Sequence, residues 1–335
     1  MKAYRFFKWQ EAAKLVDIDI PEPGPGQVRL KVAGNGICGS DLHLMHNWTE
    51  APSHLDIQLP MTVGHEVGGY IEKLGPGVEG FKVGKAALIT IAGCGNCKFC
   101  TEGFNQYCQN KGKQVGMGLD GGLAEYVIAP AGALIEIDGL DPAIASPLVD
   151  AGLSSYHAVK RILPLLKPDT TVAIIGVGGL GHLAIQEIKA LSKAKIIAYD
   201  LSEETLKIAK ELGADEAYKS SPENFIPNSC EAVLDFVGAG VTIQSSAKMI
   251  KPLGHIVVVG RGPGSFEFKD RALPYGAMIS TTFGGTRREL MELVELVKKG
   301  AINPHIEKYK LSEIELAFDR LKKGEINGRA VIIPD

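Results

Sequence analysis

The chain reads TVAIIGVGGLGH over residues 171–182, and this stretch decides the fold. Its first five residues are a continuous apolar run, which is typical of a parallel strand covered on both faces. Three glycines follow in the spacing G-x-G-x-x-G, at Gly176, Gly178 and Gly181. A helix is predicted directly after them, from Leu180 to Leu191. A strand, these glycines and a helix in that order predict a site for the pyrophosphate of a dinucleotide at the helix N-terminus.

Further strands and helices follow at the spacing of βαβ units. Apolar runs predict strands over 196–199, 232–236 and 255–259, with a helix over 244–250 between the last two. This alternation predicts an α/β fold with a doubly wound parallel sheet of the Rossmann type.

Asp200 ends the second predicted strand, nineteen residues after Gly181. A carboxylate at this place accepts hydrogen bonds from the hydroxyls of the adenosine ribose. Because Glu203 and Glu204 add negative charge nearby, a 2′-phosphate is repelled, and NAD is favoured over NADP. The alternative interpretation is a glycine-rich turn without a ligand, followed by an Asp that caps a helix.

Residues 1 to about 150 have a different pattern of apolar and polar residues. Runs at 27–32, 67–71 and 86–90 predict short strands, and no long helical period occurs in this part. Near the other end, a helix is predicted over 287–299 and a strand over 329–333.

Four cysteines lie within fifteen residues, in GCGNCKFCTEGFNQYC at 93–108. They are Cys94, Cys97, Cys100 and Cys108, and their spacing predicts one tetrahedral, structural zinc ion with no position left for chemistry. Two disulfides and an iron–sulfur cluster are the alternatives. The last gap of seven residues, with Gln109 after Cys108, departs from the ferredoxin pattern.

The composition is that of an ordinary globular protein, with a net charge of −3 over 335 residues. This slightly acidic balance argues against a nucleic-acid groove. No apolar run reaches the ~20 residues that span a bilayer, so no membrane partner is expected. Charges at Lys8, Glu11 and Lys14 interrupt the place where a signal peptide would have its apolar core. A cytoplasmic location is therefore expected.

Four motifs occur in one order along the chain: CGSD at 38–41, GHE at 64–66, the cysteine run and GVGGLG at 176–181. In this combination, over essentially the whole chain, the sequence resembles the zinc-dependent alcohol dehydrogenases of the medium-chain dehydrogenase/reductase superfamily. The resemblance implies a GroES-like, mostly β catalytic domain at 1–150 and 285–335, with the structural zinc lobe at about 93–109. It implies a Rossmann NAD-binding domain at 151–284, with the active site between the two.

By the same resemblance, Cys38, His65 and Asp150 are the protein ligands of a catalytic zinc. Asp150 stands where many members carry a cysteine, and it keeps the formal charge of the site unchanged. Glu66 is a second candidate ligand, since polyol dehydrogenases of the superfamily use the Glu of GHE. The resemblance thus implies NAD and two zinc ions per subunit.

Ser40 and His43 have the family's spacing for a proton relay from the substrate alcohol to solvent. Asp41 is expected to hydrogen-bond His65 and fix its tautomer. Trp48 is expected to line the substrate pocket, although a Trp on a loop is as often simple packing.

The cofactor-binding residues implied by the motif and the resemblance extend beyond the three glycines and Asp200. Arg329 matches the family's pyrophosphate-binding Arg, and the turn at 281–284 is expected to offer backbone groups to the nicotinamide carboxamide. The remaining members of the set are Gly179, Leu180, Val259, Thr281 and Phe283.

The expected reaction is hydride transfer between a primary or secondary alcohol and NAD⁺, giving an aldehyde or ketone, in a homotetramer. A polyol or sugar dehydrogenase of the same superfamily is the nearest alternative. A non-catalytic NAD sensor would lack residues of the metal set or the relay, and the zinc-free quinone reductases lack the cysteine run. This chain has the metal set, the relay residues and the cysteine run, which argues against both classes.

Overall fold

A computed structural model of the chain describes residues 1–53, 55–110 and 114–335. They form two compact units. The first comprises Met1–Asp150, Thr286–Val294 and Pro304–Asp335, and the second Ala151–Gly285 and Glu295–Asn303. The second unit therefore includes Gly285 and Glu295–Asn303, which the sequence prediction assigns to the first domain, and the predicted domain boundaries stay a prediction. None of the described helices is long and apolar enough to cross a membrane.

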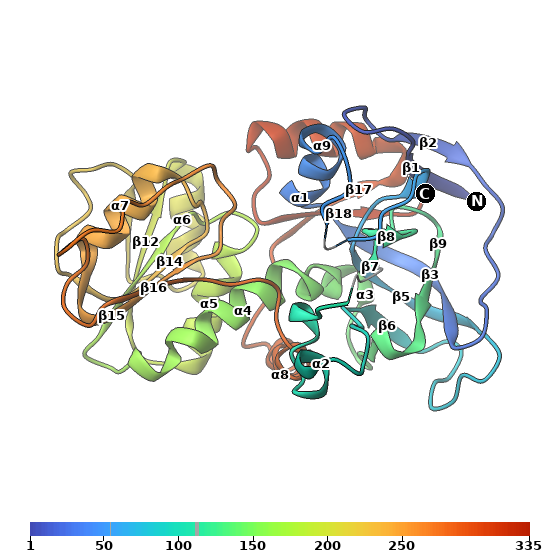
Figure 1. Ribbon diagram of the computed structural model, residues 1–335, viewed down its shortest axis with the longest axis horizontal. Helices are drawn as coiled ribbons and strands as arrows, with labels where there is room; N and C mark the ends of the chain where they lie inside the picture. Colours follow the sequence, from blue (N-terminus) through green and yellow to red (C-terminus); the bar gives the residue numbers. More distant parts are fainter. Residues whose placement is uncertain (54, 111–113) are drawn as a thin grey trace. The chain divides into compact units, whose positions relative to one another are not determined.

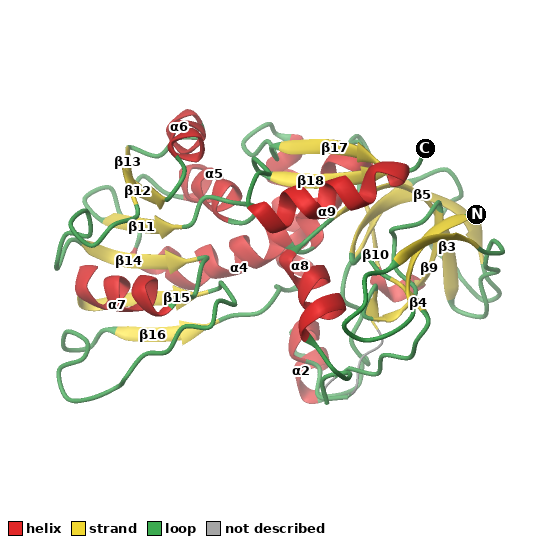
Figure 2. Cartoon of the chain, turned by 90° about the horizontal axis from the view of Figure 1, so that it is seen from above, coloured by secondary structure: helices red, strands yellow, loops and turns green. Residues whose placement is uncertain are grey.

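The second unit is built on a six-stranded parallel sheet (Figure 2). Its strand order is β13-β12-β11-β14-β15-β16, which corresponds to the order 3-2-1-4-5-6 of dinucleotide-binding doubly wound folds. The strands are β11 (Thr171–Ile175), β12 (Lys195–Asp200), β13 (Glu216–Lys219), β14 (Cys230–Asp235), β15 (Ile250–Val258) and β16 (Met278–Thr281). The order reverses between β11 and β14, and this switch point lies beside the glycine motif.

Alternate residues of β11 enter two different apolar cores, one on each face of the sheet. Val172 and Ile174 pack into one core, while Ala173 and Ile175 pack into the other. A strand buried on both faces needs an unbroken apolar run. This is the pattern from which the strand and the fold class were predicted, and both predictions are confirmed.

Helices of the second unit precede the first of these strands or connect consecutive ones. They are α4 (Ala151–Ile162), α5 (Gly181–Leu191), α6 (Glu203–Glu211) and α7 (Gly240–Met249), with a short 3₁₀ turn η5 (Leu163–Leu165). Ser202 caps α6 as its side chain accepts a hydrogen bond from Thr205 N at 3.3 Å. The close approach of α5 to β11 depends on Gly181, because a Cβ there would lie 2.0 Å from Gly176 O.

The first unit is mostly β structure (Figure 1). Its strands are β1 (Lys2–Phe6), β2 (Lys14–Asp17), β3 (Gln27–Gly36), β4 (Met61–Thr62), β5 (Glu66–Leu74), β6 (Ala86–Ile89), β7 (Gln114–Val115), β8 (Gly118–Leu119), β9 (Tyr126–Pro130), β10 (Leu134–Glu136), β17 (Ile306–Lys310) and β18 (Arg329–Ile333). One sheet has the order β2-β1-β4, and a seven-stranded sheet runs β10-β6-β5-β3-β18-β17 with β9 also on β3.

The long strand β3 organises the first unit. Its first half pairs with β9, its far end pairs with β18, and β5 runs antiparallel along most of its length. Residues far apart in the sequence therefore meet where β3 ends.

Helices in the first unit are short. They are α1 (Gly39–Leu42), α2 (Lys98–Thr101), α3 (Pro142–Ala145) and α9 (Ile314–Lys323), with the π-helix η1 (His43–Asn47) and 3₁₀ turns η2 (Asn105–Tyr107), η3 (Ala131–Ala133), η4 (Ser146–Val149) and η6 (Leu311–Glu313). Helix α8 (Arg287–Lys298) begins in the first unit and ends in the second. In the described part of 1–150, each α-helix has four residues and the other helical segments are the five-residue η1 and the 3₁₀ turns, as the missing helical period indicated.

We predict that Gly181→Ala lowers the stability of the protein, while Gly178→Ala does not. The new methyl at position 181 meets the backbone oxygen of Gly176, so α5 must move away from β11, at a cost of about 1–3 kcal/mol. A Cβ on Gly178 has nothing within 4 Å, which makes this variant the matched control. Denaturant unfolding of both proteins measures the difference. Equal unfolding free energies for the two variants would contradict this account of the helix–strand contact.

Candidate functional site

Two antiparallel strands bring Cys38 and His65 together. Gly36, the last residue of β3, pairs with Glu66, the first residue of β5. Cys38 follows β3 at the start of α1, and His65 directly precedes β5. Asp150 follows η4, which packs against β5.

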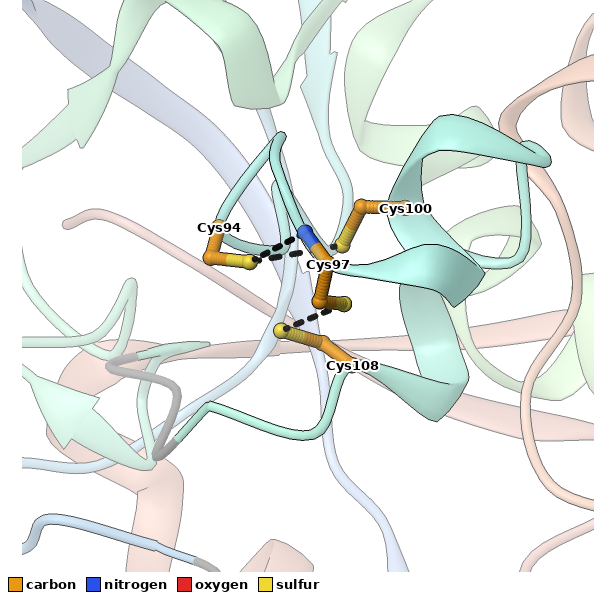
Figure 3. Close-up of side chains that lie close together, drawn as sticks. All are labelled: Cys94, Cys97, Cys100 and Cys108. Atoms are coloured by element: carbon orange, nitrogen blue, oxygen red, sulfur yellow. Dashed lines mark hydrogen bonds between the residues drawn. The ribbon is translucent and has the colours of Figure 1, made fainter.

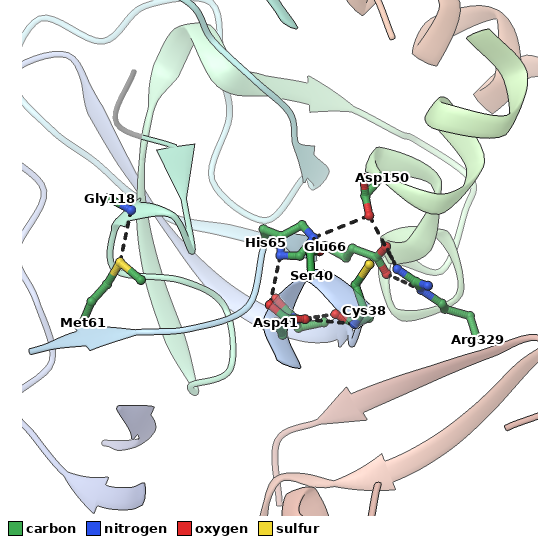
Figure 4. A network of polar contacts seen from close by, with 11 residues as sticks. Cys38, Ser40, Asp41, Met61, His65, Glu66, Gly118, Asp150 and Arg329 are labelled. Atoms are coloured by element: carbon green, nitrogen blue, oxygen red, sulfur yellow. Dashed lines mark hydrogen bonds and ion pairs between the residues drawn. The ribbon is translucent and has the colours of Figure 1, made fainter. Parts of the chain in front are cut away.

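The ligand atoms of Cys38, His65, Glu66 and Asp150 all lie within 4.8 Å of one another (Figure 4). One thiol, one imidazole and carboxylate oxygens are the donors that zinc binds. The residues present therefore fit a zinc ion. The three predicted ligands lie in one place, and Glu66 lies with them.

The ring of His65 is oriented by a buried carboxylate. Its Nδ1 is 3.0 Å from Asp41 Oδ1, and Asp41 is 0 % exposed. With Nδ1–H donating to Asp41, Nε2 is left facing Asp150 Oδ2 at 3.5 Å and Ser40 Oγ at 3.3 Å. This is the tautomer in which Nε2 can bind a metal. The predicted contact between Asp41 and His65 is present.

The site attracts positive charge. Burial disfavours the imidazolium, but the charge of Asp41 and the hydrogen bond to Asp150 outweigh it and raise the pKa of His65 well above its usual value. Burial also acts against the Asp150 carboxylate, yet His65 holds the pKa of Asp150 far below its usual range. A divalent cation would satisfy these carboxylates more fully than a proton does.

Glu66 and Arg329 form a buried ion pair that no local sequence pattern indicates. Arg329 Nε donates to Glu66 Oε2 at 2.9 Å, and Nη2 contacts the other oxygen. The same Nη2 lies 3.5 Å from Asp150 Oδ2. Gly36 leaves the space for this carboxylate, because a Cβ there would lie 1.9 Å from Glu66 Oε2. Arg329 thus neutralises part of the acidic set, and its predicted contact with the pyrophosphate stays a prediction.

Ser40 and His43 lie on the consecutive helices α1 and η1. Ser40 Oγ faces the metal-binding edge of His65. His43 Nδ1 pairs with the side-chain amide of Asn47 at 2.8 Å, which leaves Nε2 as its second polar atom. Asn47 lies four residues after His43 and orients that ring, although no motif in the sequence distinguishes it.

The four cysteines of the predicted zinc knot converge around α2 (Figure 3). Their ligand atoms lie within 4.8 Å of one another, and the Sγ–Sγ distances Cys94–Cys100 and Cys97–Cys108 are both 3.9 Å. Zinc–sulfur bonds of about 2.3 Å in a tetrahedron put sulfurs about 3.8 Å apart. All four cysteines are free, so the two-disulfide alternative does not hold.

Two of the four thiols, Cys94 and Cys97, are already activated, whereas burial raises the pKa of Cys100 to about 11. Hydrogen bonds from the backbone N–H groups of Asn96 and Cys97 lower the pKa of Cys94 to about 6, against a smaller opposing effect of burial. Backbone N–H groups also lower the pKa of Cys97. Thiolates are the form that binds metal, so Cys94 and Cys97 are prepared for it, and the convergence of all four sulfurs fits a structural zinc.

The glycine motif forms an open turn before α5. Gly178 has no atom within 4 Å of where a Cβ would be, and Gly179 and Leu180 complete the turn into the helix. Asp200 accepts a backbone hydrogen bond on each oxygen, from Val177 N at 2.7 Å and Ser202 N at 3.0 Å. The acid predicted from its spacing is therefore held beside the glycine turn, and the residues fit a dinucleotide.

At the ends of β15 and β16 lie the other predicted cofactor residues. Val259 N donates to Asp235 O at 2.8 Å, and Thr281 ends β16, two residues before Phe283. The buried Thr282 Oγ1 between them has no hydrogen-bond partner in the described part of the chain. An unpaired hydroxyl beside Thr281 and Phe283 fits the predicted carboxamide site. Trp48 packs against the core of the first unit, and its role in a substrate pocket stays a prediction.

Two family models match the chain. Residues 24–139 match the alcohol dehydrogenase GroES-like domain, and residues 179–299 match the zinc-binding dehydrogenase model.

The chain is also similar to characterised proteins over its whole length. It is 36% identical over 344 residues to an NAD-dependent alcohol dehydrogenase of Sulfolobus acidocaldarius, covering 99% of each chain. It is 30% identical to a D-arabinose 1-dehydrogenase (NADP(+)) of Saccharolobus solfataricus, covering 99% of this chain and 97% of that one. The crystal structure of the alcohol dehydrogenase of Aeropyrum pernix superposes with a TM-score of 0.91 at 33% identity, covering 100% of both chains.

We predict that Asp41→Asn weakens metal binding at the Cys38 set by about 10–100-fold. Asp41 accepts hydrogen bonds from both His65 Nδ1 and Cys38 N, at 3.0 and 2.9 Å. An amide has only one acceptor oxygen, so one of these two ligand residues loses its support. Competition with a chromophoric zinc chelator measures the affinity.

Asp138→Asn is the matched control. Asp138 also belongs to the first unit, and its exposed carboxylate forms an ion pair with Lys85. It should leave both zinc affinities unchanged. An Asp41→Asn protein with the affinity of the control would show that the carboxylate does not support the metal ligands.

Proposed function

This chain belongs to the zinc-dependent alcohol dehydrogenases of the medium-chain dehydrogenase/reductase superfamily, and we propose that it interconverts alcohols and aldehydes or ketones with NAD. The observation that carries the proposal is the convergence of Cys38, His65 and Asp150 with the Ser40 hydroxyl, 3.3 Å from His65 Nε2. Primary and secondary alcohols are the proposed substrates.

Zinc, when bound, supplies a Lewis acid that lowers the pKa of the alcohol, and NAD⁺ supplies the hydride acceptor. Cys38, His65 and Asp150 are the proposed ligands. Arg329 holds the Glu66 carboxylate through both of its oxygens. This ion pair leaves three protein ligands and one open position, which is the pattern of catalytic rather than structural zinc sites.

Ser40 and His43 are the proposed path for the proton. Ser40 lies next to the metal-binding nitrogen of His65, so its hydroxyl is placed to accept the proton of the alcohol. Asn47 occupies Nδ1 of His43, so Nε2 is the nitrogen that would take part in the relay. His43 is half-buried and passes the proton on to solvent.

The proposed cofactor is NAD rather than NADP. Asp200 is held at the end of β12 by two backbone N–H groups, and Glu203 and Glu204 follow in the first turn of α6. A 2′-phosphate at this place would meet several negative charges. The ratio of kcat/KM for NAD⁺ and NADP⁺ tests this preference.

A sugar or polyol dehydrogenase is the second candidate function, since one relative acts on D-arabinose. Both candidates predict the same metal site and the same hydride transfer. A panel of simple alcohols, polyols and aldoses, with NADH formation as the readout, separates them. Higher kcat/KM for an aldose or polyol than for every simple alcohol would favour the second candidate.

We also propose a homotetramer. Strand β16 is an edge strand of the six-stranded sheet, and exposed apolar side chains lie on or near it. They are Met278 in the strand, and Tyr275 and Leu253, which are joined by a hydrogen bond from Leu253 N to Tyr275 O; each is more than half exposed. Apolar edge strands of this kind are usually covered. Light scattering of the purified protein measures the assembly.

We predict two zinc ions per subunit with separable roles. Cys94→Ser should lose one zinc and lower the melting temperature, while kcat per folded subunit stays close to wild type, because this knot leaves no open position for substrate. The reciprocal variant Cys38→Ser should lose the other zinc and the activity but keep its melting temperature. Metal analysis, thermal unfolding and kcat measure the three quantities. One zinc per fully loaded wild-type subunit would refute the two-site assignment.

We predict that Ser40→Ala lowers kcat/KM for alcohol oxidation by roughly a hundredfold or more, at every pH. His43→Ala should slow the reaction most at low pH, where solvent hydroxide is scarce and an internal proton path helps most. The measurement is kcat/KM for one alcohol across pH. A His43→Ala profile parallel to wild type would remove His43 from the relay. Near-normal activity of Ser40→Ala would place the substrate hydroxyl elsewhere.

A further inference from the structure

Arg261 is held at a fixed place by two glycines packed against a neighbouring loop. It lies in the sequence Gly260-Arg261-Gly262, directly after β15. A Cβ on Gly260 would lie 2.3 Å from the carbonyl carbon of Val237, and a Cβ on Gly262 would lie 2.6 Å from Val237 O. Gly262 N also donates to Val237 O at 3.0 Å. The backbone on either side of Arg261 is therefore tied to the loop that follows β14.

The side chain of Arg261 lies over an aromatic ring rather than beside an acid. Its Cζ is 5.3 Å from the centroid of the Phe283 ring, in the turn after β16. Within the residues that the structure describes, Arg261 has no carboxylate partner. A cation that rests on a ring keeps its full charge available to whatever binds nearby.

The guanidinium charge of Arg261 lies near the carboxyl ends of β14, β15 and β16. In a sheet of this strand order, a dinucleotide crosses the carboxyl edge at the switch point, which here is between β11 and β14. Asp200 marks the adenosine side, at the end of β12. The other half of the cofactor, the nicotinamide, then falls on the side of β14 to β16. This step rests on the NAD-dependent function proposed above.

The nicotinamide ring carries a positive charge in NAD⁺ and none in NADH. The pyrophosphate charge is the same in both forms, so a nearby cation discriminates between them only through the ring. Like charges at distances of several ångströms in a partly solvated site repel by an energy that corresponds to about a three- to tenfold change in affinity.

We propose that Arg261 is a specificity-determining residue that weakens the binding of NAD⁺ relative to NADH. The charge on its guanidinium raises the free energy of the oxidised complex and not that of the reduced complex. On the enzyme, this favours transfer of the hydride from the alcohol carbon onto the ring, with the alcohol proton leaving to solvent. The Asp235 carboxyl group also lies at this end of the sheet, but its oxygens accept hydrogen bonds from Val237 N, Gly238 N and Thr242 Oγ1.

The test compares the dissociation constants of NAD⁺ and NADH, measured with zinc-loaded protein in the absence of alcohol. NADH binding is followed by its fluorescence, and NAD⁺ binding by displacement of NADH. Arg261→Met keeps an apolar chain on Phe283 and removes the charge, so the ratio Kd(NAD⁺)/Kd(NADH) should fall about three- to tenfold. Arg261→Lys keeps the charge and should keep a ratio close to wild type.

Lys248→Met is the matched control. Lys248 is exposed near the end of α7, which leads to the amino end of β15, so the same loss of charge occurs at the opposite edge of the sheet. Its ratio should equal that of wild type. Raising the ionic strength should lower the wild-type ratio toward that of Arg261→Met, because salt screens an exposed charge.

Two results would overturn the inference. An unchanged ratio in Arg261→Met would show that the ring does not feel this charge. Equal weakening of NAD⁺ and NADH would place Arg261 on the pyrophosphate, which both forms share. Failure of wild-type protein to bind either form is a different outcome, and it would contradict the proposed function itself.

Discussion

The pairing of Gly36 with Glu66 is the contact on which the metal site depends. It joins the end of β3 to the start of β5. Cys38 lies two residues after Gly36, and His65 directly precedes Glu66. The strand register fixes both ligands before any metal binds, because a slip of one residue would turn each side chain to the other face of the sheet. Gly36 adds the space that the Glu66 carboxylate fills.

Charge balance then determines what this site can hold. Asp41, Glu66 and Asp150 lie beside one thiol and one imidazole, and Arg329 is the cation that the chain itself provides. Burial of acids at this density is costly unless cations neutralise them. A divalent ion held by Cys38, His65 and Asp150 would supply the missing positive charge. Asp41 and Arg329 keep the ligands and the remaining carboxylate in place around it.

Local patterns predicted much of the fold. The apolar run of β11, the glycines before α5 and the acid at the end of β12 all depend on residues close together in the sequence, and the structure places them as expected. Strands β13 and β16 were missed because they lie at the edges of the sheet and have half-exposed, mixed sequences. Helix α9 was missed as well, although its apolar face packs against the first unit's core.

For the site, the sequence indicated which residues belong together but not how they are paired. Cys38, His65 and Asp150 were identified through the order of motifs along the chain. The ion pair of Glu66 with Arg329 joins residues 263 positions apart, and no local pattern indicates such a contact. Asn47, which orients His43, is one of many polar residues on a surface helix, and only the geometry distinguishes it.

The most direct test of the central claim is the oxidation of a secondary alcohol by metal-depleted and zinc-restored enzyme, with NADH formation as the readout. The account predicts no NADH formation once the Cys38, His65 and Asp150 set is empty. It predicts full recovery when zinc returns to that set. Undiminished oxidation by enzyme whose only remaining zinc is held by the four cysteines would contradict the claim that this set carries the reaction.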